Sequence, residues 1–387
     1  MPLQMVVWEL TLRCNQACGH CGSRAGRARS DELTTPEALA VVDQLAEAAV
    51  EEVALIGGEA YLRADWDRIA RAITARGMTC SMVTGGRGLD HGVARRATRA
   101  GIVNVAVSLD GLEAAHDTQR GWPGSWQAAR EALRRLSAAG VATCVNTQIN
   151  RHSVGDLEAL VTELRHARIW AWRPALTVPM GRAADHWDWL LQPWEMLGLF
   201  PRLAALAARC RDWGIVFAPG DNLGYFGPYE ALWRGGRSGH GHWPGCHAGT
   251  RALGIEADGT VKGCLSLPGG EPYAVGNLRD TPLRDLLMTK RLRDTAVRTE
   301  QDLWGFCRGC YYASECRAGC TWTGHALFGR AGNNPYCHHR VLVLGKRGLR
   351  ERLEPIAGAR GVPFDHGRFE LIAEPIPEGA MADVQPC

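Results

Sequence analysis

The chain has 387 residues, 46% hydrophobic and 22% charged, with 44 basic and 41 acidic side chains and a formal net charge of +3. This length and composition predict a globular protein with one large domain and a smaller one. The small net charge gives no reason to expect nucleic acid as a partner. Since the sequence has neither a secretory signal pattern nor 18 consecutive apolar residues, we expect a cytoplasmic protein without a membrane partner.

Short β-branched apolar runs alternate with helical patterns from residue 5 to about residue 220. The predicted strands are 5–11, 53–56, 79–83, 103–109, 142–149 and 169–178. The predicted helices are 35–49, 65–76, 91–100, 125–139, 153–166 and 194–213. Six such units predict an α/β fold, a partial (β/α)6 barrel of the TIM type, with its working residues at the carboxyl ends of the strands.

The composition of the chain changes after this barrel pattern. The expected segments are the barrel at 1–218, a linker or lid at 219–245, a small cysteine-rich domain at 246–340 and a tail at 341–387. The cysteine-rich segment has little helical periodicity apart from 283–298, which predicts that metal supplies its order. The tail is expected to contain one helix, 341–353, followed by polar, proline-spaced sequence.

Three cysteines lie close together directly after the first predicted strand. Cys14, Cys18 and Cys21 have the spacing C-x3-C-x2-C. Three thiolates on one loop can hold three irons of a cubane cluster and leave the fourth iron open to a small molecule. A zinc site is the alternative, but its fourth ligand would have to be His20, which adjoins Cys21. The spacing therefore favours a reactive cofactor site.

This cysteine run resembles the signature of the radical S-adenosylmethionine (radical SAM) superfamily. The resemblance implies that Cys14, Cys18 and Cys21 hold a catalytic [4Fe–4S] cluster whose open iron binds the amine and carboxylate of S-adenosylmethionine. It also implies that the reduced cluster cleaves this cofactor to a 5′-deoxyadenosyl radical, which abstracts hydrogen from the substrate.

Further residues at the predicted strand ends match motifs of that family. Gly57, Gly58 and Glu59 resemble its GGE motif, in which a carboxylate and backbone carbonyls accept hydrogen bonds from the cofactor's ammonium group. Ser108 and Arg120 resemble the pair that holds the cofactor's carboxylate or ribose, although Arg120 has a surface salt bridge as its alternative. The remaining candidates for ribose contacts are Thr84, Asn146 and Gln148.

A second group of cysteines resembles the seven-cysteine SPASM motif, a C-terminal extension of radical SAM enzymes. Its members are Cys246, Cys264, Cys307, Cys310, Cys316, Cys320 and Cys337. A zinc ribbon would explain only Cys307 and Cys310. The resemblance implies two auxiliary clusters, and hence three [4Fe–4S] clusters in all. The outer cluster would be held by Cys307, Cys310, Cys316 and Cys337, and the inner one by Cys246, Cys264 and Cys320.

The inner set is one thiolate short of a fully ligated cluster. Family members with a fully ligated inner cluster carry a further cysteine where this chain has His240. The inner cluster is therefore either open at one iron or closed by another side chain, with His240, His242 and His247 as candidates. The other cysteines lack cluster spacing and are expected to be ordinary apolar or tail residues: Cys80, Cys144, Cys210 and Cys387.

The resemblance favours a peptide maturase that oxidatively modifies, by cross-linking for example, a ribosomally synthesised peptide. Formylglycine formation is not expected, since Leu265 follows Cys264 where sulfatase-maturing enzymes have an aspartate. Two alternatives remain: a dehydrogenase or epimerase of a small molecule or protein side chain, and a non-catalytic iron–sulfur scaffold or electron carrier.

The expected partners follow from the same resemblance. They are a peptide or protein substrate and an external electron donor such as flavodoxin or ferredoxin. No leader-binding domain precedes the first predicted strand, so leader recognition is expected to use the barrel, the segment 219–245 or a separate leader-binding protein.

Overall fold

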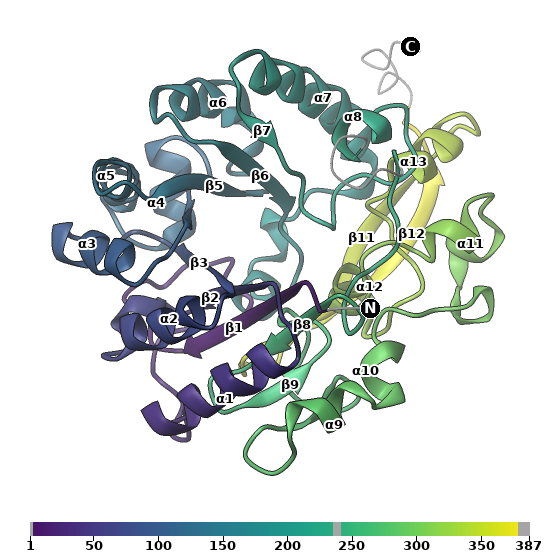
Figure 1. Cartoon of the computed structure of the whole chain (residues 1–387). Coiled ribbons are helices and arrows are strands. Elements are labelled where there is room, and N and C mark those ends of the chain that lie inside the picture. Colours follow the sequence, from purple (N-terminus) through teal and green to yellow (C-terminus); the bar gives the residue numbers. More distant parts are fainter. Residues whose placement is uncertain (1–2, 235–240, 378–387) are drawn as a thin grey trace.

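The computed structural model describes residues 3–234 and 241–377, in which one large sheet is covered along its outer side by helices (Figure 1). The strand order is β10-β9-β8-β1-β2-β3-β4-β5-β6-β7. The strands are β1 (Met5–Thr11), β2 (Glu52–Gly57), β3 (Thr79–Thr84), β4 (Asn104–Ser108), β5 (Ala142–Ile149), β6 (Ala171–Leu176), β7 (Val216–Phe217), β8 (Ala252–Ile255), β9 (Thr260–Lys262) and β10 (Ala274–Asn277). Neighbouring strands from β8 through β1 to β7 are parallel, as in a barrel built from strand–helix units.

Helices that follow the barrel strands pack on the outer face of the sheet, and shorter helices lie in and after the cysteine-rich segment (Figure 1). They are α1 (Thr35–Glu47), α2 (Trp66–Ala75), α3 (His91–Arg99), α4 (Glu113–Arg120), α5 (Ser125–Ala138), α6 (Leu157–His166), α7 (Met196–Asp212), α8 (Glu230–Arg234), α9 (Leu283–Leu287), α10 (Lys290–Asp294), α11 (Ala313–Cys316), α12 (Thr321–Phe328) and α13 (His338–Gly345). The start of α1 shows how the sequence sets a boundary: the Thr34 hydroxyl accepts a hydrogen bond from the Glu37 backbone, and the Glu37 carboxylate accepts one from the Thr34 backbone.

The main core lies between the sheet and these helices. Val6, Trp8 and Leu10 of β1 are buried in it, whereas Glu9, on the opposite face of the same strand, lines the interior of the barrel. Alternate residues of a strand point to opposite faces, so β1 supplies both the core and the interior. The expected parallel α/β barrel is therefore confirmed, and α4 is an additional helix that the apolar pattern did not predict.

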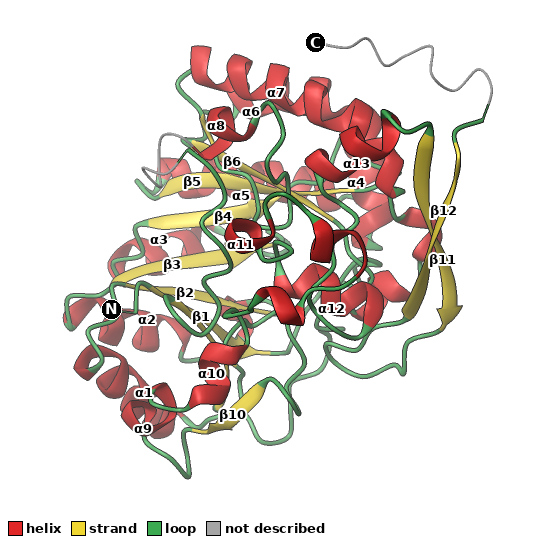
Figure 2. Ribbon diagram, turned by 90° about the vertical axis from the view of Figure 1, so that its right-hand side faces the viewer, coloured by secondary structure: helices red, strands yellow, loops and turns green. Residues whose placement is uncertain are grey.

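The tail differs from its prediction. The helix expected over 341–353 is wrong, because α13 ends at Gly345 and the chain then forms β11 (Leu349–Ala357). Gly348, with φ of +70°, allows the turn between them. The polar sequence expected to follow contains β12 (Arg368–Pro375), which pairs with β11 in an antiparallel sheet seen at one edge of Figure 2.

A buried ion pair explains part of this difference. Arg340 on α13 and Glu351 on β11 lie 2.6 Å apart (Nη2 to Oε1), and both are buried. Leu349, Glu351 and Leu353 fall on one face of this segment, on which Glu351 and Leu353 are buried, and this suits a strand with one buried face. The helical periodicity over 283–298 corresponds to two short helices, α9 and α10.

The cysteine-rich segment continues the sheet of the barrel. β8 pairs with β1 in parallel, with Met5 opposite Ala252 and Trp8 opposite Ile255. β9 and β10 then extend that edge in antiparallel fashion. Backbone hydrogen bonds therefore join the two halves of the chain directly.

The described part of 219–245 is packed against the cysteine-rich segment. Tyr225 and Trp243 form an apolar cluster with Cys316 and Cys320. Within residues 3–234 and 241–377, no helix is both long and apolar enough to cross a membrane.

Candidate functional site

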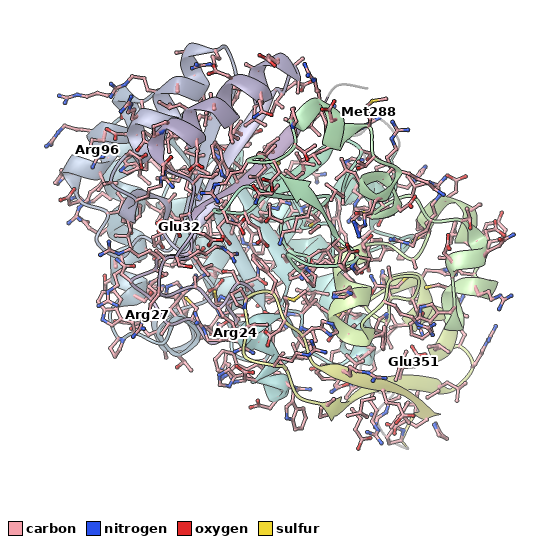
Figure 3. The ribbon with its side chains drawn as sticks, turned by 90° about the horizontal axis from the view of Figure 1, so that it is seen from below. Arg24, Arg27, Glu32, Arg96, Met288 and Glu351 are labelled. Carbon is pink, nitrogen blue, oxygen red and sulfur yellow. The ribbon has the colours of Figure 1, made fainter. Side chains whose placement is uncertain are left out.

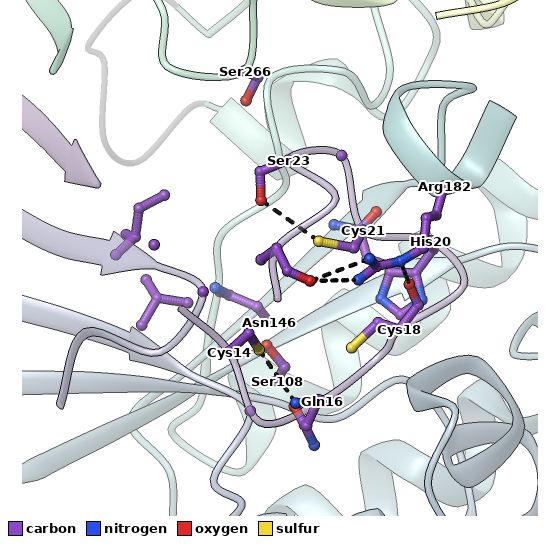
Figure 4. A pocket seen from close by; sticks show the side chains of 18 of the residues that line it. Cys14, Gln16, Cys18, His20, Cys21, Ser23, Ser108, Asn146, Arg182 and Ser266 are labelled. Carbon is purple, nitrogen blue, oxygen red and sulfur yellow. Dashed lines mark hydrogen bonds between the residues drawn. The ribbon is translucent and has the colours of Figure 1, made fainter. Parts of the chain in front are cut away.

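A cavity of about 310 Å³ lies at the carboxyl ends of the barrel strands (Figure 4). It brings together every residue predicted for the catalytic cluster and its cofactor: Cys14, Cys18, Cys21, Gly57, Gly58, Glu59, Thr84, Ser108, Arg120, Asn146 and Gln148. These residues come from separate strand ends and the loops and helix that follow them, so only the curved sheet of the partial barrel places them around one space.

The cysteine loop after β1 is held in shape by backbone hydrogen bonds. The Cys14 amide donates to the Gly26 carbonyl (2.9 Å), and the Gly19 amide donates to the Gln119 carbonyl (2.8 Å). The Arg182 guanidinium donates to the carbonyl of Cys18 (2.7 Å). The loop is thus tied to the barrel at several points, and the three thiols face one cavity (Figure 4).

Burial makes two of these thiols costly to ionise on their own. It raises the pKa of Cys14 to about 12, and it also raises the pKa of Cys18, where the nearby Arg120 acts in the opposite direction. Thiolates are the form that ligates iron, and a positively charged centre favours that form. Three thiols around one cavity, of which Cys18 is buried and the other two are partly buried, therefore fit an iron–sulfur cluster as a donor set.

The glycines after β2 permit a close approach of the chain to the cysteine loop. A Cβ atom on Gly57 would overlap the carbonyl of Thr11, and one on Gly58 would overlap the carbonyl of Arg13. Gly57 also has φ of +150°, which L side chains rarely adopt. The backbone conformation and the close contacts thus require glycine at both positions of the GGE sequence, quite apart from any ligand.

Glu59 lies behind these glycines and is only 2% exposed. Its carboxylate accepts hydrogen bonds from the Thr84 hydroxyl and the Gly85 amide, each at 2.6 Å. Burial raises the pKa of Glu59 to about 7 in spite of these bonds. Thr84, predicted as a ribose contact, therefore has Glu59 as its partner within the protein.

Arg120 is buried (8% exposed), so the surface salt bridge considered for it is not what the structure contains. Its guanidinium pairs with the carboxylate of Asp110, Nη2 to Oδ2 at 2.6 Å, and its Nη1 lies 3.8 Å from the sulfur of Cys18. His20 of the cysteine loop approaches the same Asp110 oxygen at 3.4 Å. Sequence reasoning missed Asp110, although its position two residues after Ser108, at a strand end, was a usable signal.

One wall of the cavity comes from distant parts of the chain and has no local sequence signal. Its apolar members are Val178, Met180, Leu265, Trp322 and Phe364. Phe364 belongs to the loop between β11 and β12, which returns to the cysteine loop: the Phe364 amide donates to the Gly22 carbonyl (3.2 Å). The Arg24 guanidinium donates to the Asp365 carboxylate at 2.7 Å, and Figure 3 shows Arg24 beside this yellow loop.

The four cysteines predicted for the outer cluster line a small cavity of their own. Cys307, Cys310, Cys316 and Cys337 share it with the aromatic rings of Phe226, Phe306, Tyr312 and His339. Four thiols around an apolar space fit a cluster whose irons are all ligated by the protein.

The three cysteines predicted for the inner cluster are also neighbours. Burial raises the pKa of Cys320, and the charges of Cys246 and Cys264 add to that rise. The Tyr225 hydroxyl accepts a hydrogen bond from the Cys320 amide (3.0 Å) and donates one to the carbonyl of Asp221. This hydroxyl therefore connects the inner set to the segment after β7.

The histidines considered as ligands of the inner cluster have different surroundings. His240 lies outside the described residues. The His242 ring nitrogen Nδ1 donates to the Trp243 carbonyl (3.0 Å), and burial lowers the pKa of His247, which adjoins Cys246. Of the unassigned cysteines, Cys387 is outside the described residues, and the other three lie in the apolar core as predicted: Cys80, Cys144 and Cys210.

Comparison with known proteins agrees with this arrangement. The family model described as the radical SAM superfamily matches residues 8–161, and the SPASM model, an iron–sulfur cluster-binding domain, matches residues 246–311. Mycofactocin maturase MftC of Mycobacterium tuberculosis is 30% identical over 396 residues, which cover 96% of this chain and 90% of that one. The chain belongs to the radical SAM superfamily. It is a SPASM-type member, a class whose domains imply [4Fe–4S] clusters and S-adenosylmethionine.

Not all proteins similar to this chain are named as maturases. The AdoMet-dependent heme synthase of Nitratidesulfovibrio vulgaris is 27% identical to this radical SAM protein over 360 residues, 87% of this chain and 92% of the synthase. A solved structure, Streptococcus suis SuiB bound to the precursor peptide SuiA, has a TM-score of 0.62 at 16% identity and covers 83% of this chain and 72% of SuiB. At that identity the likeness concerns the fold alone.

Proposed function

We propose that this radical SAM protein is an oxidoreductase that modifies a ribosomally synthesised peptide, with cross-linking as the favoured outcome. The observation that carries the proposal is the cavity at the carboxyl ends of the barrel strands, which we call the reaction cavity. In this cavity the cysteine loop faces Leu265 and Trp322 of the SPASM half. A substrate group held between these walls would lie beside both the catalytic cofactor site and the auxiliary cysteines. The 30% identity to mycofactocin maturase MftC supports a maturation reaction.

The cofactors proposed are three [4Fe–4S] clusters and S-adenosylmethionine. When bound, these groups supply a 5′-deoxyadenosyl radical and sites for electron transfer. Cys14, Cys18 and Cys21 would hold the catalytic cluster. Ser108, Asn146 and Gln148 would orient the cofactor's carboxylate or ribose through hydrogen bonds, and Gly57, Gly58 and Glu59 would accept hydrogen bonds from its ammonium.

Two of the predicted contacts have a supporting role as well. Thr84 holds the Glu59 carboxylate in place. Arg120, which forms an ion pair with Asp110, places its guanidinium beside the sulfur of Cys18. The apolar wall of the cavity would keep water from the reacting groups.

The seven remaining motif cysteines would hold the auxiliary clusters in the outer and inner sets described above. The fourth position of the inner cluster is left open or taken by one of the histidines, of which His242 and His247 lie in the described part of the chain. The protein would work in the cytoplasm with flavodoxin or ferredoxin as electron donor and a separate leader-binding protein.

A second candidate function is a reaction on a small molecule or a protein side chain, such as a dehydrogenation or epimerisation. The 27% identity to an AdoMet-dependent heme synthase over most of the chain supports this second candidate. Assays of the reduced protein with S-adenosylmethionine, by mass spectrometry, separate the two. A mass loss of about two hydrogen atoms in a short peptide encoded beside the gene supports the first function, and conversion of an iron porphyrin supports the second.

The radical SAM assignment of the cysteine loop has its own test. The variant with Cys14, Cys18 and Cys21 all changed to alanine is expected to release no 5′-deoxyadenosine from S-adenosylmethionine under anaerobic reduction. Its auxiliary clusters should keep their absorption and electron paramagnetic resonance signals, since their ligands are elsewhere. Release at the wild-type rate would contradict the assignment, and so would absence of iron from this loop in the wild-type protein.

A further inference from the structure

A second cavity, which we call the outer cavity, lies behind the wall of the reaction cavity. It has a volume of about 660 Å³ and is formed by the loop between β11 and β12, the turn at 268–271 and α12. Phe364 lines both cavities, so this one side chain separates them. The outer cavity therefore adjoins the place where the proposed chemistry occurs.

Phe364 is held in an unusual conformation. Its φ is +56°, which is rare for a bulky residue, and the loop fixes it from both sides. The Gly181 amide donates to the Asp365 carbonyl (2.7 Å), and the Asp365 carboxylate accepts from Arg24 and from the Val362 amide. Such strained residues persist where the surrounding structure over-determines them, and they cluster at functional sites.

The ring of Phe364 is also held by a buried charge network. The ammonium of Lys262 lies 3.8 Å from the ring centroid and pairs with Glu256 at 2.5 Å. Arg29 joins Glu256 to Glu9, which lines the reaction cavity. The wall between the two cavities is thus built from fixed parts.

The outer cavity contains a buried polar group that the protein does not satisfy. His325 is only 6% exposed, and its Nε2 has no hydrogen-bond partner within the described chain. Its Nδ1 lies 2.9 Å from the Tyr273 hydroxyl. When that hydroxyl donates to Nδ1, Nε2 carries the ring proton and is a donor that lacks an acceptor. Buried donors normally have partners, so a ligand in the cavity that His325 lines is a candidate acceptor for it.

The charges around the outer cavity indicate the chemistry of that ligand. Three of its four acidic side chains are engaged by cations: Glu256 by Lys262 and Arg29, Asp365 by Arg24, and Glu271 by Arg291. The fourth, Asp258, accepts from the Thr260 amide. Arg360 and Arg368 are exposed at the rim and form no ion pair within the part of the chain described. Two cations and one anion, Asp258, are therefore without an ion-pair partner among the described residues, and an N–H donor lacks an acceptor, so the groups left over favour a negatively charged ligand.

We propose that the outer cavity binds a carboxylate-bearing stretch of the peptide substrate, on the other side of Phe364 from the reaction cavity. This inference rests on the proposed function and adds to it a second binding site and a charge preference. Arginine forks at the rim suit a carboxylate, and the buried donor of His325 suits an oxygen that has left water. The carboxylate comes either from acidic side chains or from the end of the peptide.

The test is equilibrium binding to the reconstituted protein with S-adenosylmethionine, followed by fluorescence anisotropy of dye-labelled hexapeptides. Three probes separate the sources of the carboxylate: an amidated peptide of alternating glycine and glutamate, its amidated glutamine counterpart, and a glycine peptide with a free carboxyl end. We expect the glutamine peptide to bind about tenfold more weakly than the glutamate peptide. Tight binding of the glycine peptide alone would assign the site to a chain end.

The variants place the binding at the outer cavity. Arg360→Gln with Arg368→Gln is expected to raise the Kd of the preferred peptide about tenfold, since each lost ion pair at a rim has a modest effect. A matched control, Arg71→Gln with Arg95→Gln, removes the same charge from exposed positions on α2 and α3 and should change the Kd less than about twofold. His325→Phe, which keeps a ring but no donor, should weaken binding about threefold or more.

The outcomes separate this inference from the proposed function. Equal binding of the glutamate and glutamine peptides, with no tight binding of the glycine peptide, would overturn it. So would equal effects of the rim and control variants. Release of 5′-deoxyadenosine from S-adenosylmethionine without any peptide is measured in the same samples. If that release persists while the charge preference is absent, the radical SAM function stands and the outer site is refuted.

Discussion

Arg120 and Asp110 form an ion pair, Nη2 to Oδ2 at 2.6 Å, that is buried directly beneath the cysteine loop. Burial lowers the pKa of Arg120, whereas the Asp110 carboxylate raises it, and the net shift is upward. Because the same guanidinium lies 3.8 Å from the sulfur of Cys18, the ion pair sets the electrostatic environment of a proposed cluster ligand. It connects the stability of the barrel to the chemistry proposed for it.

Removing one member of this pair should be costly. Asp110→Asn leaves the Arg120 charge buried without a counter-charge, and such losses typically destabilise a protein by about 3–5 kcal/mol. Urea unfolding and iron content after reconstitution measure the effect. The exposed pair of Arg134 and Glu131 is the control, because Glu131→Gln should cost less than about 1 kcal/mol. Equal losses in the two variants would contradict this account of the pair.

The link between Thr84 and Glu59 predicts an indirect effect on the cofactor. Thr84→Val removes the donor to the Glu59 carboxylate and the acceptor of the Gly86 amide, whereas Thr84→Ser keeps both. A lost hydrogen bond to a charged group is worth about 1.5–3 kcal/mol, so we expect the Kd for S-adenosylmethionine to rise about tenfold or more in the valine variant alone. Titration calorimetry on the reconstituted protein measures it, and equal affinity in both variants would refute it.

The Tyr225 hydroxyl predicts a coupling between the inner cysteines and the segment after β7. Tyr225→Phe leaves the buried Cys320 amide without its acceptor, which should cost about 1–3 kcal/mol. We also expect the reduction potential of the inner cluster to rise, because the variant removes an electron-rich oxygen that faces the backbone of Cys320. Potentiometric titration followed by electron paramagnetic resonance checks this. Tyr312→Phe, near the outer set, is the control and should leave the inner signal unchanged.

His116 predicts a pH dependence of stability. It is fully buried, its Nδ1 accepts from the Asp110 amide (3.0 Å), and its Nε2 therefore donates to Ser125 (3.2 Å). Burial, together with the charge of Arg120, lowers the pKa of His116 to about 4 from an unfolded value of 6.5. The unfolded chain binds the extra proton first, so this stability is complete above pH 6.5 and is lost as the pH falls towards 4.

The size of that loss follows from the shift in pKa. It should reach about 3 kcal/mol, since each pKa unit corresponds to about 1.4 kcal/mol. His116→Gln keeps an acceptor and a donor but does not titrate. The difference in unfolding free energy between wild type and this variant, measured at several pH values, should shrink by that amount on acidification. A difference that is constant with pH would show that His116 is not the titrating group.

Local patterns were sufficient for most of the barrel and for the proposed site. The apolar period placed the strands, and the cysteine spacing with the glycine turns placed the residues that line the reaction cavity, because all of them follow strands whose ends must meet. Residues defined by tertiary contacts were missed. Phe364 lies more than 300 positions from Gly22, whose carbonyl its amide contacts, and no local signal encodes that.

The tail shows a different reason for failure. The apolar residues after Cys337 fit a helical period as far as Gly345, and Leu349 and Leu353 continue that spacing. The strand wins because Glu351 is placed against Arg340 and because β12 offers a partner, neither of which is a local property. The alternating signs of charge at Arg350, Glu351 and Arg352 were the signal that could have favoured a strand over a helix.

The ladder between β1 and β8 has a consequence for how this molecule can be divided. Truncation ahead of β8 would expose the backbone edge of the first strand from Met5 to Trp8, a template for aggregation, and would strip the cysteine-rich portion of its anchor. Barrel and appendage should consequently melt in a single cooperative transition, and neither is expected to survive as an isolated fragment.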